Sequence, residues 1–175
     1  MFSDPSYNIE QLSLQSGAKV ADLGCGSGFY SMSAARAVGD KGKVYAVDVQ
    51  KGLLERVKKE AVTEGLHNVE VIWGDVEKMG GTKLRDGSVD AVITANLLFQ
   101  IEHKNDFALE VKRILKPGGK LLLIDWSGSF GGMGPEHGSV VGRRAGEELF
   151  EKNGFAIERE IRAGAHHWGV IFRRT

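Results

Sequence analysis

The chain has 175 residues, with 23 basic and 23 acidic side chains and therefore no formal net charge. This length suits one domain around a single core, so we expect residues 1–175 to form one unit. A neutral chain has no electrostatic reason to bind nucleic acid or an anionic membrane, which favours a small-molecule or uncharged partner. Its longest apolar runs, such as LLLI, are far shorter than the roughly 20 residues that span a membrane.

The cysteine content bears on where the protein works. Cys25 is the only cysteine and cannot form an internal disulfide. No basic start followed by an apolar block marks the chain for export. We therefore expect a soluble protein in a reducing, cytoplasmic setting.

In chain order, the first half of the sequence predicts strands that alternate with helices. After a short N-terminal segment, residues 1–17, an apolar run predicts a strand over residues 19–23. Apolar side chains then recur every three residues from Phe29 to Val38, which predicts an amphipathic helix. The next predicted elements are a strand, a helix that ends before Gly65 and another strand, at residues 43–49, 53–61 and 69–73.

The second half continues this order as far as a glycine-rich segment. A strand at residues 89–95 is followed by a helix that begins after Asn105 and that Pro117 stops. The next strand covers residues 120–126. Residues 127–142 then hold six glycines and a proline without an apolar period, which predicts a mobile loop.

The C-terminal part predicts an antiparallel hairpin. A short helix at residues 144–153 leads to two segments of alternating pattern, residues 155–162 and 166–173, joined through residues 163–165. Together with the five earlier strands, they predict an α/β protein with a mostly parallel, seven-stranded sheet and a C-terminal antiparallel hairpin.

The early stretch VADLGCGSG predicts a ligand-binding turn. Gly24, Gly26 and Gly28 follow a buried strand and precede a helix, where positive φ angles and close approach of a ligand both favour glycine. A dinucleotide fingerprint would require glycine at position 29, which is Phe29 here. Asp22 would repel a pyrophosphate but attract an ammonium group, so the turn favours a partly cationic ligand.

Two further acids follow at strand ends. Asp48 lies 20 residues after Gly28, where a carboxylate can accept hydrogen bonds from both hydroxyls of a ribose. Asp75 ends the third strand and can accept from an exocyclic amine such as that of adenine. Each acid has a local alternative, because Asp48 can cap the helix near Lys51 and Asp75 can cap a turn before Val76. The three converging strand ends predict a nucleoside site.

Four segments carry a family resemblance. VADLGCGSG, VYAVDV, VIWGDV and VKRILKPGGKLLLIDW occur in this order within residues 18–126. Together they resemble class I S-adenosylmethionine-dependent methyltransferases, nearest to the quinone-biosynthesis and general small-molecule branch. Phe99 and Gln100 replace a histidine pair that is frequent in that branch. The resemblance implies a Rossmann-like, doubly wound fold, S-adenosyl-L-methionine as cofactor, and in-line methyl transfer to a small molecule.

The resemblance also implies which residues bind the cofactor. The three turn glycines approach its methionine part, and Asp22 orients the loop near the ammonium group. Asp48 holds the ribose, and Asp75 holds the adenine amine beside the amide of Val76. Asn96 ends the fourth strand, where family members often bind the cofactor through the backbone. The expected cofactor-binding set is therefore Asp22, Gly24, Gly26, Gly28, Asp48, Asp75, Val76 and Asn96.

The acceptor is expected between the N-terminal segment, which includes Phe2, and the loop over residues 127–142. The candidate acceptor-binding residues, chosen by position, are Tyr7, Tyr30, Trp126 and His137. No general base is evident from the sequence. Enzymes that methylate amino groups of nucleic acids carry an NPPY-like turn after the fourth strand. Residues 94–100 read TANLLFQ there instead, so we expect no nucleic-acid substrate.

Two other functions stay open at this point. A non-catalytic cofactor-binding module would account for the missing histidine pair and base, whereas Phe29 and Asp22 disfavour a dinucleotide oxidoreductase. The histidines show no metal-ligand spacing, so no metal is expected. The N-terminal segment is short for a cover over the acceptor, so the site is either open or closed by a partner subunit in a homodimer.

Overall fold

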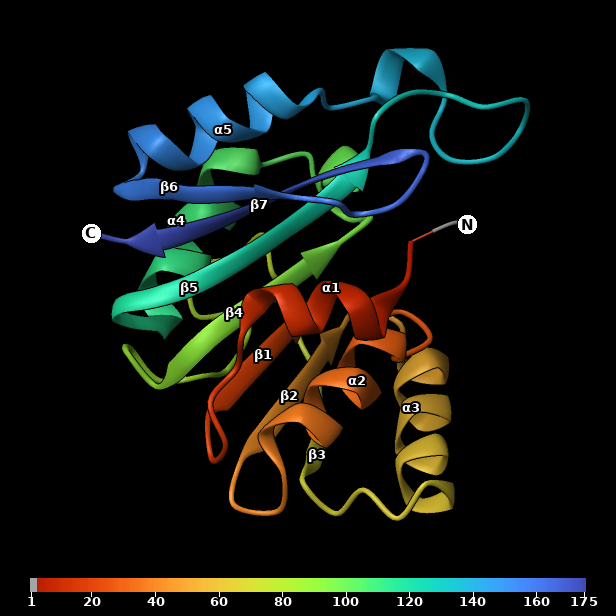
Figure 1. The fold of residues 1–175 in the computed structure, drawn as a ribbon, viewed down its shortest axis with the longest axis vertical. Coiled ribbons are helices and arrows are strands. Elements are labelled where there is room, and N and C mark those ends of the chain that lie inside the picture. The colour runs from red at the N-terminus through yellow and green to blue at the C-terminus, as the bar shows by residue number, and fades with distance from the viewer. Residues whose placement is uncertain (1–2) are drawn as a thin grey trace.

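A computed structural model describes residues 3–175 and shows a seven-stranded sheet with helices on both faces (Figure 1). The strands are β1 (Lys19–Leu23), β2 (Lys43–Asp48), β3 (Val69–Trp73), β4 (Val89–Ala95), β5 (Leu115–Trp126), β6 (Phe155–Ile161) and β7 (His167–Arg174). Their order across the sheet is β3-β2-β1-β4-β5-β7-β6. Among the strands of residues 3–175, β7 alone points opposite to the others, and it pairs antiparallel with both β5 and β6. The predicted mostly parallel fold with a C-terminal hairpin is confirmed.

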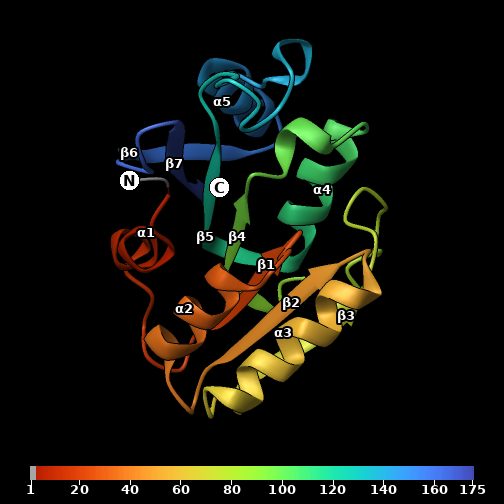
Figure 2. The same ribbon diagram turned by 90° about the vertical axis from the view of Figure 1, so that its right-hand side faces the viewer.

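The helices form two layers, one on each face of the sheet (Figure 2). They are α1 (Pro5–Leu12), α2 (Phe29–Val38), α3 (Lys51–Thr63), α4 (Lys104–Ile114) and α5 (Arg143–Lys152), with 3₁₀ turns η1 (Leu98–Gln100) and η2 (His137–Ser139). The first three cover one face, and α4 and α5 cover the other. Within residues 3–175, no helix combines the length and the apolar character needed to cross a membrane.

Both faces of the central strands are buried, which explains why these segments read as unbroken apolar runs. Val20 of β1 belongs to the core cluster that includes α1 and α2, while Ala21 belongs to the cluster on the other face that includes Phe107 of α4. Phe107 is fully buried and meets Phe150 of α5 edge to face, with ring centroids 6.3 Å apart. Burying such a side chain stabilises the fold by about 1.5–3 kcal/mol. Packing of the two helical layers therefore stabilises the sheet up to its carboxyl-terminal edge.

The N-terminal segment, for which the sequence analysis predicted no element, contains α1 over residues 5–12. Pro5 is the first residue of the helix, and the side chain of Asp4 accepts a hydrogen bond from the Tyr7 amide at 3.2 Å. Proline at this position and aspartate before it are both helix-start signals. Phe2, named for the acceptor site, lies outside the described residues.

The entry to β5 also differs. The strand begins at Leu115, which pairs with Val89, and after a shift in register Lys120 pairs with Ala91. The KPGG segment that was expected only to stop the helix therefore forms a bulge within the strand. The other strands of the parallel part agree with their predicted bounds to within one residue.

Candidate active site

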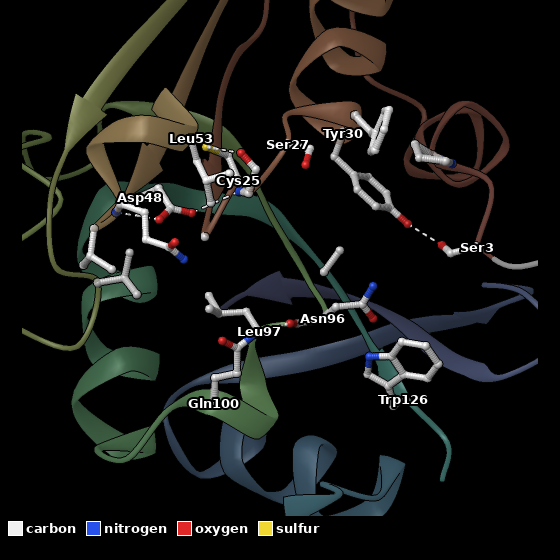
Figure 3. A pocket seen from close by; sticks show the side chains of 18 of the residues that line it. Ser3, Cys25, Ser27, Tyr30, Asp48, Leu53, Asn96, Leu97, Gln100 and Trp126 are labelled. Carbon is white, nitrogen blue, oxygen red and sulfur yellow. Dashed lines mark hydrogen bonds between the residues drawn. The ribbon is translucent and has the colours of Figure 1, made fainter. Parts of the chain in front are cut away.

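The carboxyl ends of β1, β2, β4 and β5 surround a cavity of about 470 Å³. From β1 the sheet continues on one side to β2 and β3, and on the other side to β4 and β5. Ligands of open α/β sheets bind where the strand order reverses in this way. Figure 3 shows Asp48 at one end of the cavity and Tyr30 with Trp126 at the other.

The glycine turn joins β1 to α2 along the wall of this cavity. Gly24, Gly26 and Gly28 have positive φ angles of 68°, 51° and 82°. A Cβ on Gly24 would lie 2.7 Å from Cδ1 of Leu97, and one on Gly28 would lie 2.8 Å from Cγ2 of Val57. A Cβ on Gly26 would meet nothing within 4 Å. Gly24 and Gly28 therefore permit tight packing, while Gly26 leaves bare backbone beside the cavity.

Asp48 connects the end of β2 to the glycine turn. Its Oδ2 accepts from the Gly26 amide at 3.0 Å, and its Oδ1 accepts from the Gln50 amide at 2.9 Å. The side chain is buried yet borders the cavity. Each carboxylate oxygen can accept a further hydrogen bond, so the group keeps capacity for a ligand hydroxyl. The helix-capping alternative is not what the structure shows, because α3 has Gln50 as its N-cap and no side-chain cap.

Asp75 is turned toward its own loop. Its carboxylate lies 2.9 Å from Nζ of Lys78 and accepts from the Glu77 amide at 3.0 Å. The donating ammonium of Lys78 holds the pKa of Asp75 below its ordinary value. Gly74 and Val76, on either side of Asp75, line the cavity, whereas Asp75 does not. The local turn-capping alternative therefore describes the Asp75 side chain, and the neighbouring backbone borders the site.

Asp22 lies inside the sheet and does not line the cavity. It accepts a hydrogen bond from Oγ of Ser31 in α2 at 2.6 Å. Burial raises the pKa of the Asp22 carboxyl to about 6. The bond joins β1 to α2 behind the glycine turn, so the side chain supports the turn from beneath.

Asn96 follows β4 in a left-handed conformation, with φ at 57°. It borders the cavity, and its backbone carbonyl accepts from Nε2 of Gln100 at 3.0 Å. Within residues 3–175 its buried Oδ1 has no hydrogen-bond partner. An unpaired buried acceptor costs about 1–3 kcal/mol, so this oxygen is suited to a donor group on a ligand. Asn96 and Asp48 thus supply acceptors for ammonium and hydroxyl groups, as the expected cofactor requires.

The opposite end of the cavity is aromatic. Tyr30 and Trp126 both border it, and their contact with an acceptor stays a prediction. The Tyr30 hydroxyl lies 2.6 Å from Oγ of Ser3 and accepts from Nδ2 of Asn8 at 2.8 Å. Through this contact the segment before α1 is held at the cavity, where Ser3 is one of the lining residues.

Two of the four predicted acceptor residues lie elsewhere. Tyr7 borders a neighbouring hollow between α1 and the β6–β7 hairpin, and His137 is exposed in η2. The prediction placed them by sequence position, which does not fix which face of a helix a side chain occupies. Their role in acceptor binding stays a prediction.

His167 is a cavity residue that sequence reasoning missed. It begins β7 and pairs with Trp126 of β5, and the ring centroids of the two side chains lie 4.4 Å apart. Because β7 runs antiparallel, its first residue reaches the edge where the parallel strands end. Only the hairpin register could have indicated this, and register is weakly fixed by sequence.

Comparisons with known proteins agree with this geometry. Residues 14–155 match a family described as "Methyltransferase domain". The ubiquinone/menaquinone biosynthesis C-methyltransferase UbiE of Pseudomonas entomophila is 30% identical over 69% of this chain and 46% of its own length. A SAM-dependent methyltransferase structure from Aquifex aeolicus is 30% identical, with a TM-score of 0.90 over 99% of this chain and 91% of that one. A putative type 11 methyltransferase from Sulfolobus solfataricus is 25% identical, with a TM-score of 0.78 over 100% and 95%.

The chain therefore belongs to the class I S-adenosylmethionine-dependent methyltransferases, as the four sequence segments indicated. S-adenosylmethionine is the cofactor of this class, and the expectation of that cofactor is confirmed at the level of the family. The chain spans half or less of the length of the curated relatives it matches.

Proposed function

We propose that this protein transfers a methyl group from S-adenosylmethionine to a small-molecule acceptor at the aromatic end of the cavity. The observation that carries the proposal is a single cavity with two unlike ends (Figure 3). One end holds the buried carboxylate of Asp48 beside the bare backbone of Gly26. The other end holds the rings of Tyr30 and Trp126.

The residues of the first end suit the cofactor. The spare lone pairs of Asp48 suit the ribose hydroxyls, and the amide of Val76 suits the adenine edge. Toward the other end, beside Trp126 (Figure 3), the unpaired Oδ1 of Asn96 suits the ammonium of the methionine part. When bound, the cofactor supplies an electrophilic methyl group on a positively charged sulfur.

Positioning is the main task of the protein in such a displacement. The acceptor atom has to be held in line with the donor carbon at near-attack distance while water is excluded. Ser3 and Pro5 border the cavity at the start of α1, so the N-terminal segment contributes to this enclosure. The similarity to the Pseudomonas enzyme supports an acceptor of quinone-related, aromatic type.

Two experiments test this function. Titration calorimetry of the purified chain is expected to show binding of S-adenosylmethionine and none of NAD. A panel of small phenols and quinols, with the demethylated cofactor measured as product, is expected to contain at least one acceptor. Binding of NAD without binding of S-adenosylmethionine would refute the proposal. Tight cofactor binding without product across the panel would instead favour a non-catalytic module.

We also infer a cytoplasmic location and a homodimer in which the partner helps to enclose the acceptor. A partner subunit would give the aromatic end of the cavity, bordered by Tyr30 and Trp126, a cover that excludes water. Analytical ultracentrifugation tests it, and a fully active monomer would exclude a role for the partner in the site.

A further inference from the structure

His167 carries two buried polar atoms that the fold does not use. Its Nδ1 and Nε2 are both buried, and within residues 3–175 neither has a hydrogen-bond partner. An unpaired buried polar group costs about 1–3 kcal/mol. A ligand that pairs with this ring would offset that cost, and His167 borders the cavity in which a ligand is expected.

The position of the ring does not depend on a hydrogen bond. Residues 167 and 126 are paired across β5 and β7, and the imidazole lies against the indole of Trp126 at an interplanar angle of 39°. Strand pairing and ring contact therefore fix the imidazole before any ligand arrives. A base held in this way is preorganised for proton transfer.

The imidazole also lies where two hollows meet. His167 borders the main cavity and a second hollow of about 640 Å³ between α1 and the hairpin. Tyr7 and Ala163 line this second hollow. An acceptor with its reacting ring at Trp126 thus has room for the rest of the molecule beyond His167.

The charge state of the ring suits a base. Burial, and to a lesser extent the charge of His166, hold the pKa of His167 below its ordinary value. The imidazole is therefore neutral at neutral pH, with one N–H donor and one lone pair. The other titratable or charged side chains that border the two hollows are Asp4, Tyr7, Cys25, Tyr30, Asp48 and Arg162.

We propose that His167 is a catalytic residue that accepts the proton of a hydroxyl group on a planar aromatic acceptor lying beside Trp126. This inference rests on the proposed function and names a base for it. As the acceptor oxygen forms its bond to the methyl carbon, the hydroxyl proton passes to the free imidazole nitrogen. Where the ring carbon activated by that oxygen is the acceptor, the same proton transfer occurs, and the hydrogen on the methylated carbon then leaves as a proton while the oxygen is protonated again. The electron pair of the broken carbon–sulfur bond stays on sulfur, so the positive charge of the sulfonium is replaced by that of the imidazolium.

The test uses 4-nitrophenol, whose protonated and ionised forms absorb differently, bound to the full chain without cofactor. His167→Phe keeps a flat ring against Trp126 but removes both nitrogens. His167→Gln keeps a hydrogen-bond acceptor without a base of comparable strength. His67→Phe is the matched control, since His67 is exposed and lines neither hollow. Calorimetry with S-adenosylmethionine on all four proteins reports separately on the cofactor end.

The wild type and His67→Phe are expected to bind the probe partly as phenolate. In His167→Phe and His167→Gln, the apparent pKa of the bound probe is expected to rise by about 1 unit or more. Equal spectra for the wild type and both His167 variants would overturn the proposal. Failure of the wild type to bind the probe while it binds S-adenosylmethionine would overturn it too. A wild type that binds the probe but no S-adenosylmethionine would contradict the proposed function instead.

Discussion

Oδ2 of Asp48 accepts a hydrogen bond from the amide of Gly26 at 3.0 Å, so the end of β2 is joined directly to the turn that follows β1. The bond links residues 22 positions apart in the sequence. It fixes the glycine turn and the carboxylate relative to each other before a ligand binds, which lowers the entropic cost of binding.

Asp48→Asn is expected to weaken binding of S-adenosylmethionine by about 10-fold or more. The amide nitrogen of asparagine cannot accept a hydrogen bond and the group is uncharged, so a ribose hydroxyl loses a charged acceptor, at a cost of about 1.5–3 kcal/mol. Calorimetry measures the change. Asp40→Asn, at an exposed position after α2, is the control and is expected to bind normally. Equal affinities for both variants would show that the Asp48 carboxylate does not hold the cofactor.

Gly26→Ala is expected to lose mainly cofactor affinity, whereas Gly28→Ala is expected to lose mainly stability. The added methyl at position 26 meets open space, so the variant bears only the strain of positive φ, about 1–2 kcal/mol. It nevertheless projects from a residue that lines the cavity, so cofactor affinity is expected to fall by about 10-fold or more. Urea unfolding and calorimetry together separate stability from binding.

Gly28→Ala is expected to lose more stability than Gly26→Ala, because its methyl group would also press on Val57. Val57→Ala in the same chain removes that contact, so the double variant is expected to be more stable than the sum of the single changes predicts. If the changes in the free energy of unfolding of the two single variants simply add, the contact with Val57 is not the cause of the extra loss of stability in Gly28→Ala.

Asp22→Asn is expected to change how stability depends on pH. The folded chain raises the pKa of this carboxyl from 3.8 to about 6, so the folded state retains a proton that the unfolded chain releases. The stability that this retained proton gives the folded state is therefore fully present below about pH 4 and is lost as the pH rises through about 6. The asparagine keeps an acceptor for Ser31 but does not titrate.

The free energy of unfolding, measured with urea, gives the test. From about pH 5 to about pH 7.5 the wild type is expected to lose roughly 1 kcal/mol more than Asp22→Asn. The difference between the two proteins isolates Asp22, because burial also raises the pKa of Asp125 to about 6 in both. Parallel curves would mean that the carboxyl of Asp22 titrates normally.

Tyr30→Phe is expected to loosen α1. The change removes the hydroxyl that bonds Ser3 and Asn8, at a cost of about 0.5–1.5 kcal/mol for each hydrogen bond. Hydrogen exchange of the amides in residues 5–12 is expected to become faster, because local opening is less costly. Tyr7→Phe, on the exposed side of the same helix, is the control. Unchanged exchange in Tyr30→Phe would place the attachment of α1 elsewhere.

The parallel half of the fold could be predicted because its signals are local. Strands buried on both faces give apolar runs, and the glycine turn needs glycine for steric reasons that Gly24 and Gly28 show directly. The position of Asp48 beside the turn followed from its place at a strand end. The Asp75 side chain was not predictable in this way, since its pairing with Lys78 depends on the course of the following loop.

The acceptor end was harder to predict because its residues come together through tertiary structure. Trp126 could be placed from the end of β5, but His167 reaches it only through the register of β7. Tyr7 points away from the main cavity because of the phase of α1, a helix that was not expected. Sequence patterns specify elements, whereas the meeting of side chains from α1, β5 and β7 depends on how those elements pack.

The reversed direction of β7 has an evolutionary consequence. The turn at residues 162–166 delivers His167 to the acceptor end, while the residues around Asp48 come from β1, β2 and the loops after them. Under the proposed function, insertions or substitutions in that turn would change the aromatic end of the cavity without disturbing the residues around Asp48. The two ends of the cavity can therefore change independently of each other.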